Sequence, residues 1–146
     1  MIQHRYTIHI ARPVEQVFAY LTDSRHLRDW QSNLIEIQQL TDGPLSAGTR
    51  FREVRQAGSN RSEAQAEVTR FDAAAGQFST RTLTKPQVTV DYSLHKEGDG
   101  TRLSYQFEML TTGMAPAMEP IIAAAIQKDT SADIEKLKVI LEAHPT

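Results

Sequence analysis

Five turn-forming sites divide residues 34 to 110 into short, evenly spaced segments, and this spacing limits the possible folds more than any other feature. The sites are rich in glycine, proline, asparagine or aspartate and lie at 42–44, 58–60, 76, 85–86 and 98–100. Between them, strand-like segments are expected at about 34–41, 48–56, 62–72, 76–83, 87–96 and 101–110. Connections this short join antiparallel neighbours, whereas parallel strands need a long crossover. The sequence therefore predicts an antiparallel meander.

A further strand and two short helices are expected before the meander. Residues 2–10 alternate between polar and apolar side chains, which predicts a strand with one face formed by His4, Tyr6, Ile8 and Ile10. Pro13 suits the first position of a helix, and helical spacing follows at Val14, Val17, Phe18 and Leu21. A second short helix carries Leu27 and Trp30. Two short helices thus separate the first two of seven strands.

The longest element is a helix that follows Gly113. One of its sides carries Met118, Ile122, Ile126, Thr130, Ile134, Leu137 and Leu141. The opposite side, expected to face solvent, carries Lys128, Glu135, Lys138 and Glu142. Residues 143–146 are expected to fray.

One α+β architecture accommodates these elements. An antiparallel sheet with one apolar face must cover that face, and a single long helix can do so if the sheet curves around it. The fold class predicted is therefore a seven-stranded curved antiparallel sheet around a long C-terminal helix. Small side chains at Ala123, Ala124 and Ala125 leave space beside the helix. An apolar pocket between sheet and helix follows as a hypothesis.

Length and composition indicate one domain, residues 1–146, with 40% hydrophobic and 23% charged residues. A formal net charge of -2 disfavours nucleic acid as a partner. No segment reaches the ~20 apolar residues that span a bilayer, and the N-terminus lacks the apolar stretch of a secretory signal. The absence of cysteine excludes disulfides and thiolate catalysis and favours a cytoplasmic location.

No cofactor or metal is expected. The histidines have no metal-ligand spacing, and dinucleotide, phosphate-loop and nucleophile-elbow motifs are all missing.

Several segments resemble the START-like or SRPBCC superfamily, which includes polyketide cyclases/dehydratases, lipid-transfer domains and birch-pollen-allergen-type proteins. The resemblance spans almost the whole chain and is carried by residues 8–18, 27–30, 47–51, 100–103 and 133–138. It implies a helix-grip fold with a deep hydrophobic cavity that binds or carries a lipid, polyketide or aromatic molecule. Such folds host varied chemistries, so the resemblance does not transfer an activity. The glycine-rich phosphate-type loop of plant pathogenesis-related members has no match here.

A charged pair is a candidate for the cavity interior. Glu53 and Arg55 share a strand face with Phe51, so if Phe51 points inward both charges do as well and could orient a polar ligand group. The alternative is a bulged strand, or charges that reach solvent at the cavity mouth.

Two tyrosines are the other polar candidates. Tyr92 and Tyr105 lie on the predicted inward faces of neighbouring strands, where a phenol can donate to a ligand or act as an acid. Together with Glu53 they are the catalytic candidates, although a purely structural role is an alternative. The remaining predicted ligand-binding residues, for which core packing is the alternative, are Trp30, Phe107, Met109, Met118, Ile122 and Ile126.

Three functions remain open at this point. The first is binding or carrying a hydrophobic small molecule. The second is polyketide cyclase/dehydratase-type catalysis in the same cavity, with Glu53 or a tyrosine assisting proton transfer. The third is a structural domain with a collapsed cavity that forms a homodimer.

Overall fold

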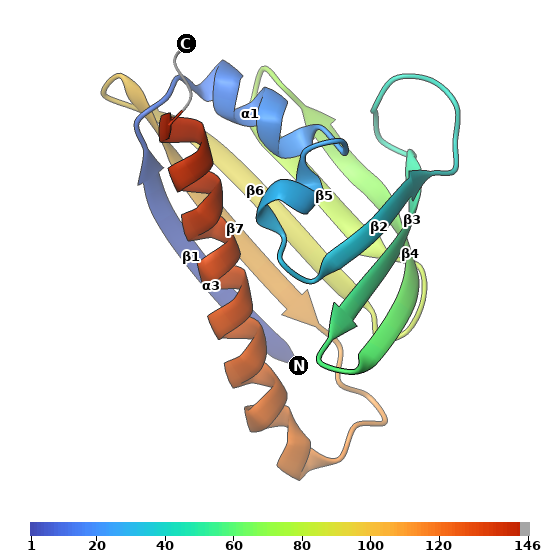
Figure 1. Ribbon diagram of the computed structural model, residues 1–146. Helices are drawn as coiled ribbons and strands as arrows, with labels where there is room; N and C mark the ends of the chain where they lie inside the picture. Colours follow the sequence, from blue (N-terminus) through green and yellow to red (C-terminus); the bar gives the residue numbers. More distant parts are fainter. Residues whose placement is uncertain (144–146) are drawn as a thin grey trace.

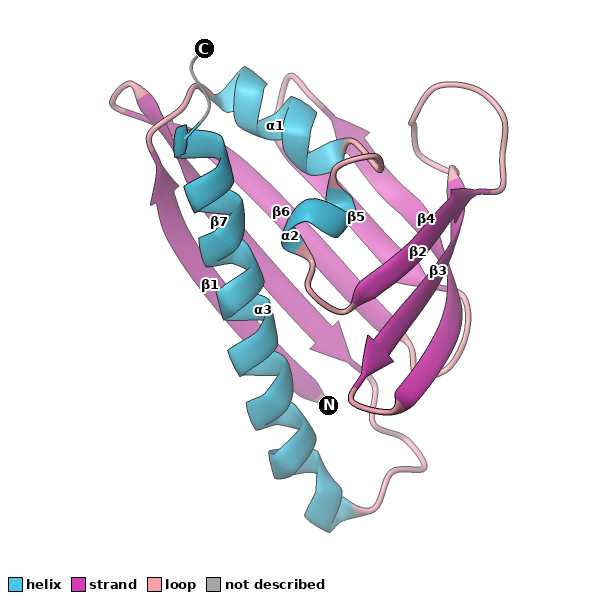
Figure 2. Cartoon of the chain, in the orientation of Figure 1, coloured by secondary structure: helices cyan, strands magenta, loops and turns pink. Residues whose placement is uncertain are grey.

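The predicted strands form one antiparallel sheet that curves around a long helix (Figure 2). The structure is a computed structural model that describes residues 1–143. Its strands are β1 (Ile2–Ile10), β2 (Leu34–Gln39), β3 (Arg50–Ala57), β4 (Asn60–Asp72), β5 (Gln77–Thr82), β6 (Val88–Glu97) and β7 (Gly100–Met109). Its helices are α1 (Val14–Thr22), α2 (Leu27–Trp30), the 3-10 turn η1 (Pro116–Met118) and α3 (Glu119–Ala143). The helix-grip fold is thereby confirmed.

The strand order in the sheet is β1-β7-β6-β5-β4-β3-β2. Strands β2 to β7 are each paired with their neighbour in sequence, so the predicted meander is confirmed. Strand β1 pairs with β7 along its whole length, from Ile2 opposite Met109 to Ile10 opposite Thr101. The first and last strands of the chain are therefore neighbours. Helix α3 comes after β7 in the chain, following a loop and η1.

Two irregularities and one glycine shape the curvature. The register shifts between Leu34 and Glu36 in β2 and between Val68 and Arg70 in β4, and such bulges bend a strand and increase its twist. Gly76 has φ +66°, and a Cβ atom there would lie 2.4 Å from the Leu94 carbonyl oxygen. Only glycine lets this turn lie so close to β6.

The concave face of the sheet carries the core. The alternating residues predicted to point inward in β6 and β7 are all buried or half-buried. They pack with the side chains of α1 and of the C-terminal half of α3, where Leu137 is fully buried. Figure 1 shows α3 lying along β1 and β7. The helices thus cover the apolar, concave face of the sheet.

Helix α1 begins one residue later than expected. Pro13 has φ -60° and ψ 150°, so it precedes the helix as its N-cap. Its carbonyl oxygen already accepts a hydrogen bond from the Val17 backbone nitrogen at 3.1 Å. A cap residue keeps extended backbone while its carbonyl starts the helical hydrogen bonding, which explains the shift.

The C-terminal half of α3 is fastened to the beginning of the chain. Lys138 Nζ donates to the His9 carbonyl oxygen at 2.5 Å, and Glu142 Oε2 accepts from the Ala11 backbone nitrogen at 2.7 Å. Lys138 and Glu142, expected on the solvent side, are 30% and 29% exposed and at the same time bind the N-terminal segment. In the N-terminal half, Glu119 pairs with the Met1 amino group at 3.2 Å, and Ile121 is 63% exposed. The predicted fraying falls mainly on residues 144–146, which lie outside the described residues.

Candidate functional site

A cavity of about 400 Å³ lies between the concave face of the sheet and the helices α2 and α3. Residues of strands β2 to β7 line it on the sheet side. Its apolar lining is formed by Leu21, Leu27, Trp30, Ile37, Phe51, Phe78, Val88, Val90, Phe107, Met109, Ile126 and Ile134. The predicted pocket is thus present, and the alternative of a collapsed cavity does not agree with the structure.

Most residues predicted to bind a ligand border this cavity. They are Trp30, Phe51, Glu53, Arg55, Tyr92, Tyr105, Phe107, Met109 and Ile126. Met118 and Ile122 are not brought to it. Met118 lies in η1, before α3 begins, so it leaves the helical register and is 45% exposed. Ile122 packs against the edge of the core, one turn before the first α3 residue in the cavity wall.

Arg55 and Glu53 both line the cavity, as their shared face with Phe51 predicted. The Arg55 guanidinium donates to Asn33 Oδ1 and to Gln31 Oε1, each at 2.8 Å. It also lies 3.4 Å from Glu53 Oε2, and the two side chains are 33% and 16% exposed. Three oxygen acceptors from neighbouring segments therefore hold this cation at the cavity wall.

Tyr92 and Tyr105 form the aromatic centre of the site. They are directly opposite in the β6–β7 register, with ring centroids 5.4 Å apart. The Tyr92 ring also stacks on Phe78 and meets the edge of Trp30. Burial raises the pKa of Tyr92 well above its usual value and also raises the pKa of Tyr105. Both phenols therefore remain protonated donors at neutral pH.

Asp133 is a cavity residue that sequence reasoning missed. Its Oδ1 accepts from the Ser32 hydroxyl at 2.9 Å and from the Ser32 backbone nitrogen at 3.2 Å. Burial raises the pKa of Asp133, although the Ser32 hydrogen bonds act in the opposite direction. Its position on the same helical side as Ile126 and Thr130 was the available signal. Gln31 and Asn33, the partners of Arg55, gave no such signal because they lie outside regular elements.

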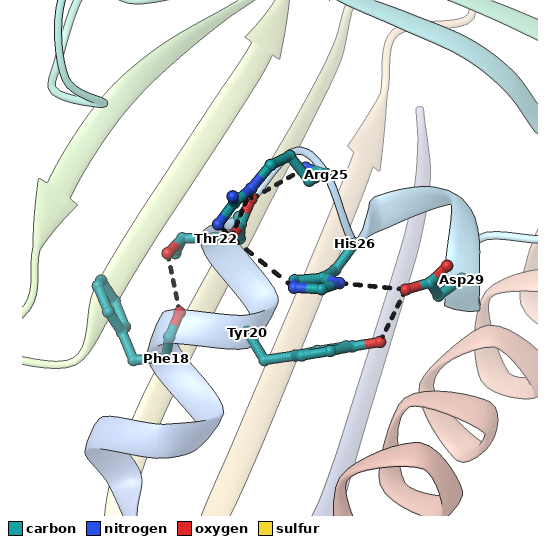
Figure 3. Close-up of polar contacts among 7 residues, drawn as sticks. Phe18, Tyr20, Thr22, Arg25, His26 and Asp29 are labelled. Carbon is teal, nitrogen blue, oxygen red and sulfur yellow. Dashed lines mark hydrogen bonds and ion pairs between the residues drawn. The ribbon is translucent and has the colours of Figure 1, made fainter.

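A polar cluster outside the cavity fixes α2, which carries Trp30 (Figure 3). The rings of Tyr20 and His26 are stacked with centroids 4.4 Å apart. The Tyr20 hydroxyl donates to Asp29 Oδ2 at 3.0 Å, and His26 Nδ1 lies 3.2 Å from the same oxygen. Because Asp29 immediately precedes Trp30, these contacts hold the indole in the cavity wall.

Trp30 itself carries an unused donor. The side chain is 2% exposed, and its Nε1 is the only buried side-chain nitrogen or oxygen within residues 1–143 that has no hydrogen-bond partner. Buried polar groups are nearly always paired, so this one is a notable feature of the site.

Neither a metal-binding cluster nor a membrane-spanning helix is found in the described part of the chain. Within residues 1–143, no group of three or more histidine, aspartate or glutamate side chains is arranged to hold a metal ion. No described helix is both long enough and apolar enough to cross a membrane.

Comparisons with known proteins agree with this geometry. A family model described as polyketide cyclase / dehydrase and lipid transport matches residues 1–142. No curated protein matches the chain. A protein of Thermus thermophilus has a similar structure, with a TM-score of 0.84, 17% identity and 99% of each chain covered. The Zhui aromatase/cyclase from Streptomyces sp. R1128 has a TM-score of 0.81 at 15% identity, covering 96% of this chain and 93% of that one. Identities this low show the fold alone.

Proposed function

The chain belongs to the polyketide cyclase / dehydrase and lipid transport family, and from this membership we propose that it binds a hydrophobic small molecule between the sheet and α3. The observation that carries the proposal is the cavity of about 400 Å³, whose lining is largely aromatic and aliphatic. Sites of this kind bind apolar ligands and use a few polar groups to orient them.

Burial of apolar area supplies the affinity in this proposal. Each Å² of apolar ligand surface removed from water contributes about 25 cal/mol before ordering costs are subtracted. The rings of Phe51, Phe78 and Phe107 present such surface on the floor, and Ile126 presents it from α3. Arg55 and the two tyrosines then orient the polar end of the ligand.

Native mass spectrometry and thermal shift measurements test this proposal together. The purified chain is incubated with a library of aromatic and lipid-like compounds, and bound mass and melting temperature are recorded. Ligands that bind only the native state raise the melting temperature, and the rise grows with the ratio of free ligand concentration to Kd. A chain that stays without bound mass and shows no thermal shift across the library would contradict the proposal.

A cyclase- or dehydratase-type reaction is the second candidate, and Asp133 favours it. A carboxyl group with a raised pKa lies in the same cavity as Arg55 and the Tyr105 phenol. Groups of this kind can exchange protons with a bound carbonyl compound. Glu53 is held against Arg55, which fits an orienting role better than proton transfer. Homodimer formation stays a prediction, to be tested by sedimentation.

A further inference from the structure

The polar groups of the cavity lie close to one another. The charges of Arg55 and Asp133 both act on the pKa of Tyr92 and on the pKa of Tyr105. The Trp30 ring meets Tyr92 edge-on, with centroids 6.5 Å apart. Arg55, Asp133 and the two tyrosines therefore lie in one part of the cavity lining.

Several hydrogen-bond acceptors of this region are already in use. Gln31 Oε1 and Asn33 Oδ1 accept from Arg55, which also lies 3.4 Å from Glu53 Oε2. Asp133 Oδ1 accepts twice from Ser32. A ligand that mainly offers donors would have to compete with these protein hydrogen bonds.

The donors of this region are largely unused. The hydroxyls of Tyr92 and Tyr105 make no hydrogen bond with any other residue in 1–143, and neither is enclosed in the way that Trp30 Nε1 is. Both residues line the cavity, so their hydroxyls open onto it. Arg55 uses three of its five N–H groups. The two phenolic hydroxyls are therefore donors that no residue in 1–143 accepts from.

The charges of the region decide what kind of acceptor fits. Arg55 is opposed by Glu53 at 3.4 Å, and its charge also acts on Asp133. Asp129, one turn before Asp133 on α3, adds a further acid to the cavity lining. Five acids (Glu53, Glu63, Glu67, Asp129 and Asp133) line the cavity against three cations (Arg55, Arg81 and Lys85), so acids outnumber cations there. A ligand carboxylate would be desolvated without gaining a net positive partner, which is unfavourable.

We propose that the cavity selects apolar molecules that carry an uncharged hydrogen-bond acceptor, such as a ketone or quinone oxygen, over molecules that carry a carboxylate. This inference rests on the proposed function and specifies its ligand class. The acceptor oxygen receives hydrogen bonds from the Tyr92 and Tyr105 hydroxyls, while the ring system occupies the apolar part of the cavity.

Three matched probes test the selection by isothermal titration calorimetry at neutral pH: 2-acetylnaphthalene, 2-ethylnaphthalene and 2-naphthoate. The ketone is expected to bind about tenfold more tightly than the hydrocarbon, the range of one or two hydrogen bonds to otherwise unpaired donors. The naphthoate is expected to bind more weakly than the ketone. The double variant Tyr92→Phe/Tyr105→Phe should remove the ketone's advantage and leave hydrocarbon affinity unchanged. Tyr6→Phe, outside the cavity lining, is the matched control.

The outcomes separate this inference from the proposed function. Equal binding of ketone and hydrocarbon would overturn the inference alone. Tightest binding of 2-naphthoate would do the same, because Arg55 would then act as an anion receptor. Loss of ketone and hydrocarbon affinity by the same factor in the double variant would also overturn it, because the hydroxyls would then have no selective role. Failure of all three probes to bind the unmodified chain would overturn the proposed function as well.

Discussion

Tyr92 and Tyr105 stand opposite one another in the β6–β7 register, with ring centroids 5.4 Å apart and their hydroxyls open to the cavity. Each ring is more than nine-tenths buried, yet neither hydroxyl bonds to another described residue. The pair therefore belongs both to the hydrophobic core and to the ligand site. Its packing contributes to stability, and its two free donors can determine which ligand fits.

The tyrosines should ionise at a higher pH than tyrosine in an unfolded chain. The pKa of all four is raised: by burial for Tyr92 and Tyr105, by the Glu135 hydrogen bond first for Tyr6, and to about 12 by burial and Asp29 for Tyr20. The pKa of each tyrosine in the folded chain exceeds the unfolded value of about 10. The contribution of the neutral phenols to the free energy of unfolding is therefore complete below that pH and is lost as the pH rises through the folded pKa. Tyrosinate absorbance should appear mainly with alkaline unfolding. Ionisation of Tyr92 or Tyr105 near the ordinary tyrosine pKa in the folded chain would contradict their described burial.

Filling the cavity should weaken ligand binding without unfolding the chain. Ala66 is 7% exposed in β4 and lines the cavity, so Ala66→Phe places a ring in the space that a ligand would occupy. We expect affinity to fall more than about tenfold, at a stability cost within the ~1–3 kcal/mol of overpacked sites. Ala57→Phe, at an exposed position of β3, is the control. Calorimetry and denaturant unfolding measure both effects, and unchanged affinity in Ala66→Phe would place the ligand elsewhere.

Asp133 tests the catalytic alternative. For a substrate that the chain turns over, Asp133→Asn and Tyr105→Phe should each lower kcat by about 10²–10⁴ with little change in KM, as expected for proton-transfer groups. Asp99→Asn, in the exposed β6–β7 turn, is the control. Retention of full kcat by both cavity variants would leave only the binding function.

The cluster that holds α2 should contribute to stability. Tyr20→Phe removes the hydrogen bond to Asp29 but keeps the ring that stacks on His26. The free energy of unfolding should fall by about 1 kcal/mol, the usual value for one hydrogen bond. Trp30 is the only tryptophan of the chain, so its fluorescence follows both unfolding and any displacement of α2. An unchanged unfolding midpoint would mean that this hydrogen bond does not support the cavity wall.

The strands and inward faces could be predicted from the sequence because both depend on local patterns. Alternation placed Tyr92, Tyr105 and Phe107 on the apolar face, and turn residues located the hairpins to within about two residues. The position of β1 beside β7 was not predicted, because that pairing joins distant parts of the chain and leaves no local signal.

The failures at the site have similar causes. Met118 fits the helical period of α3, but the chain is still in a 3-10 turn there, and periodicity alone cannot show where a helix begins. The partners of Arg55 lie between α2 and β2, where no repeating pattern assigns a direction to a side chain. Asp133 was overlooked because a carboxylate on a helix ordinarily faces water, whereas here the cavity and Ser32 accommodate it.

A crystal structure of the chain with 2-acetylnaphthalene would show directly whether the cavity binds an apolar ketone. We expect the naphthalene ring to lie in the cavity against Phe107 and Ile126, with the ketone oxygen within hydrogen-bonding distance of the Tyr92 or Tyr105 hydroxyl. A probe bound only at the molecular surface, with the space between the sheet and α3 left empty or closed by side chains, would contradict it.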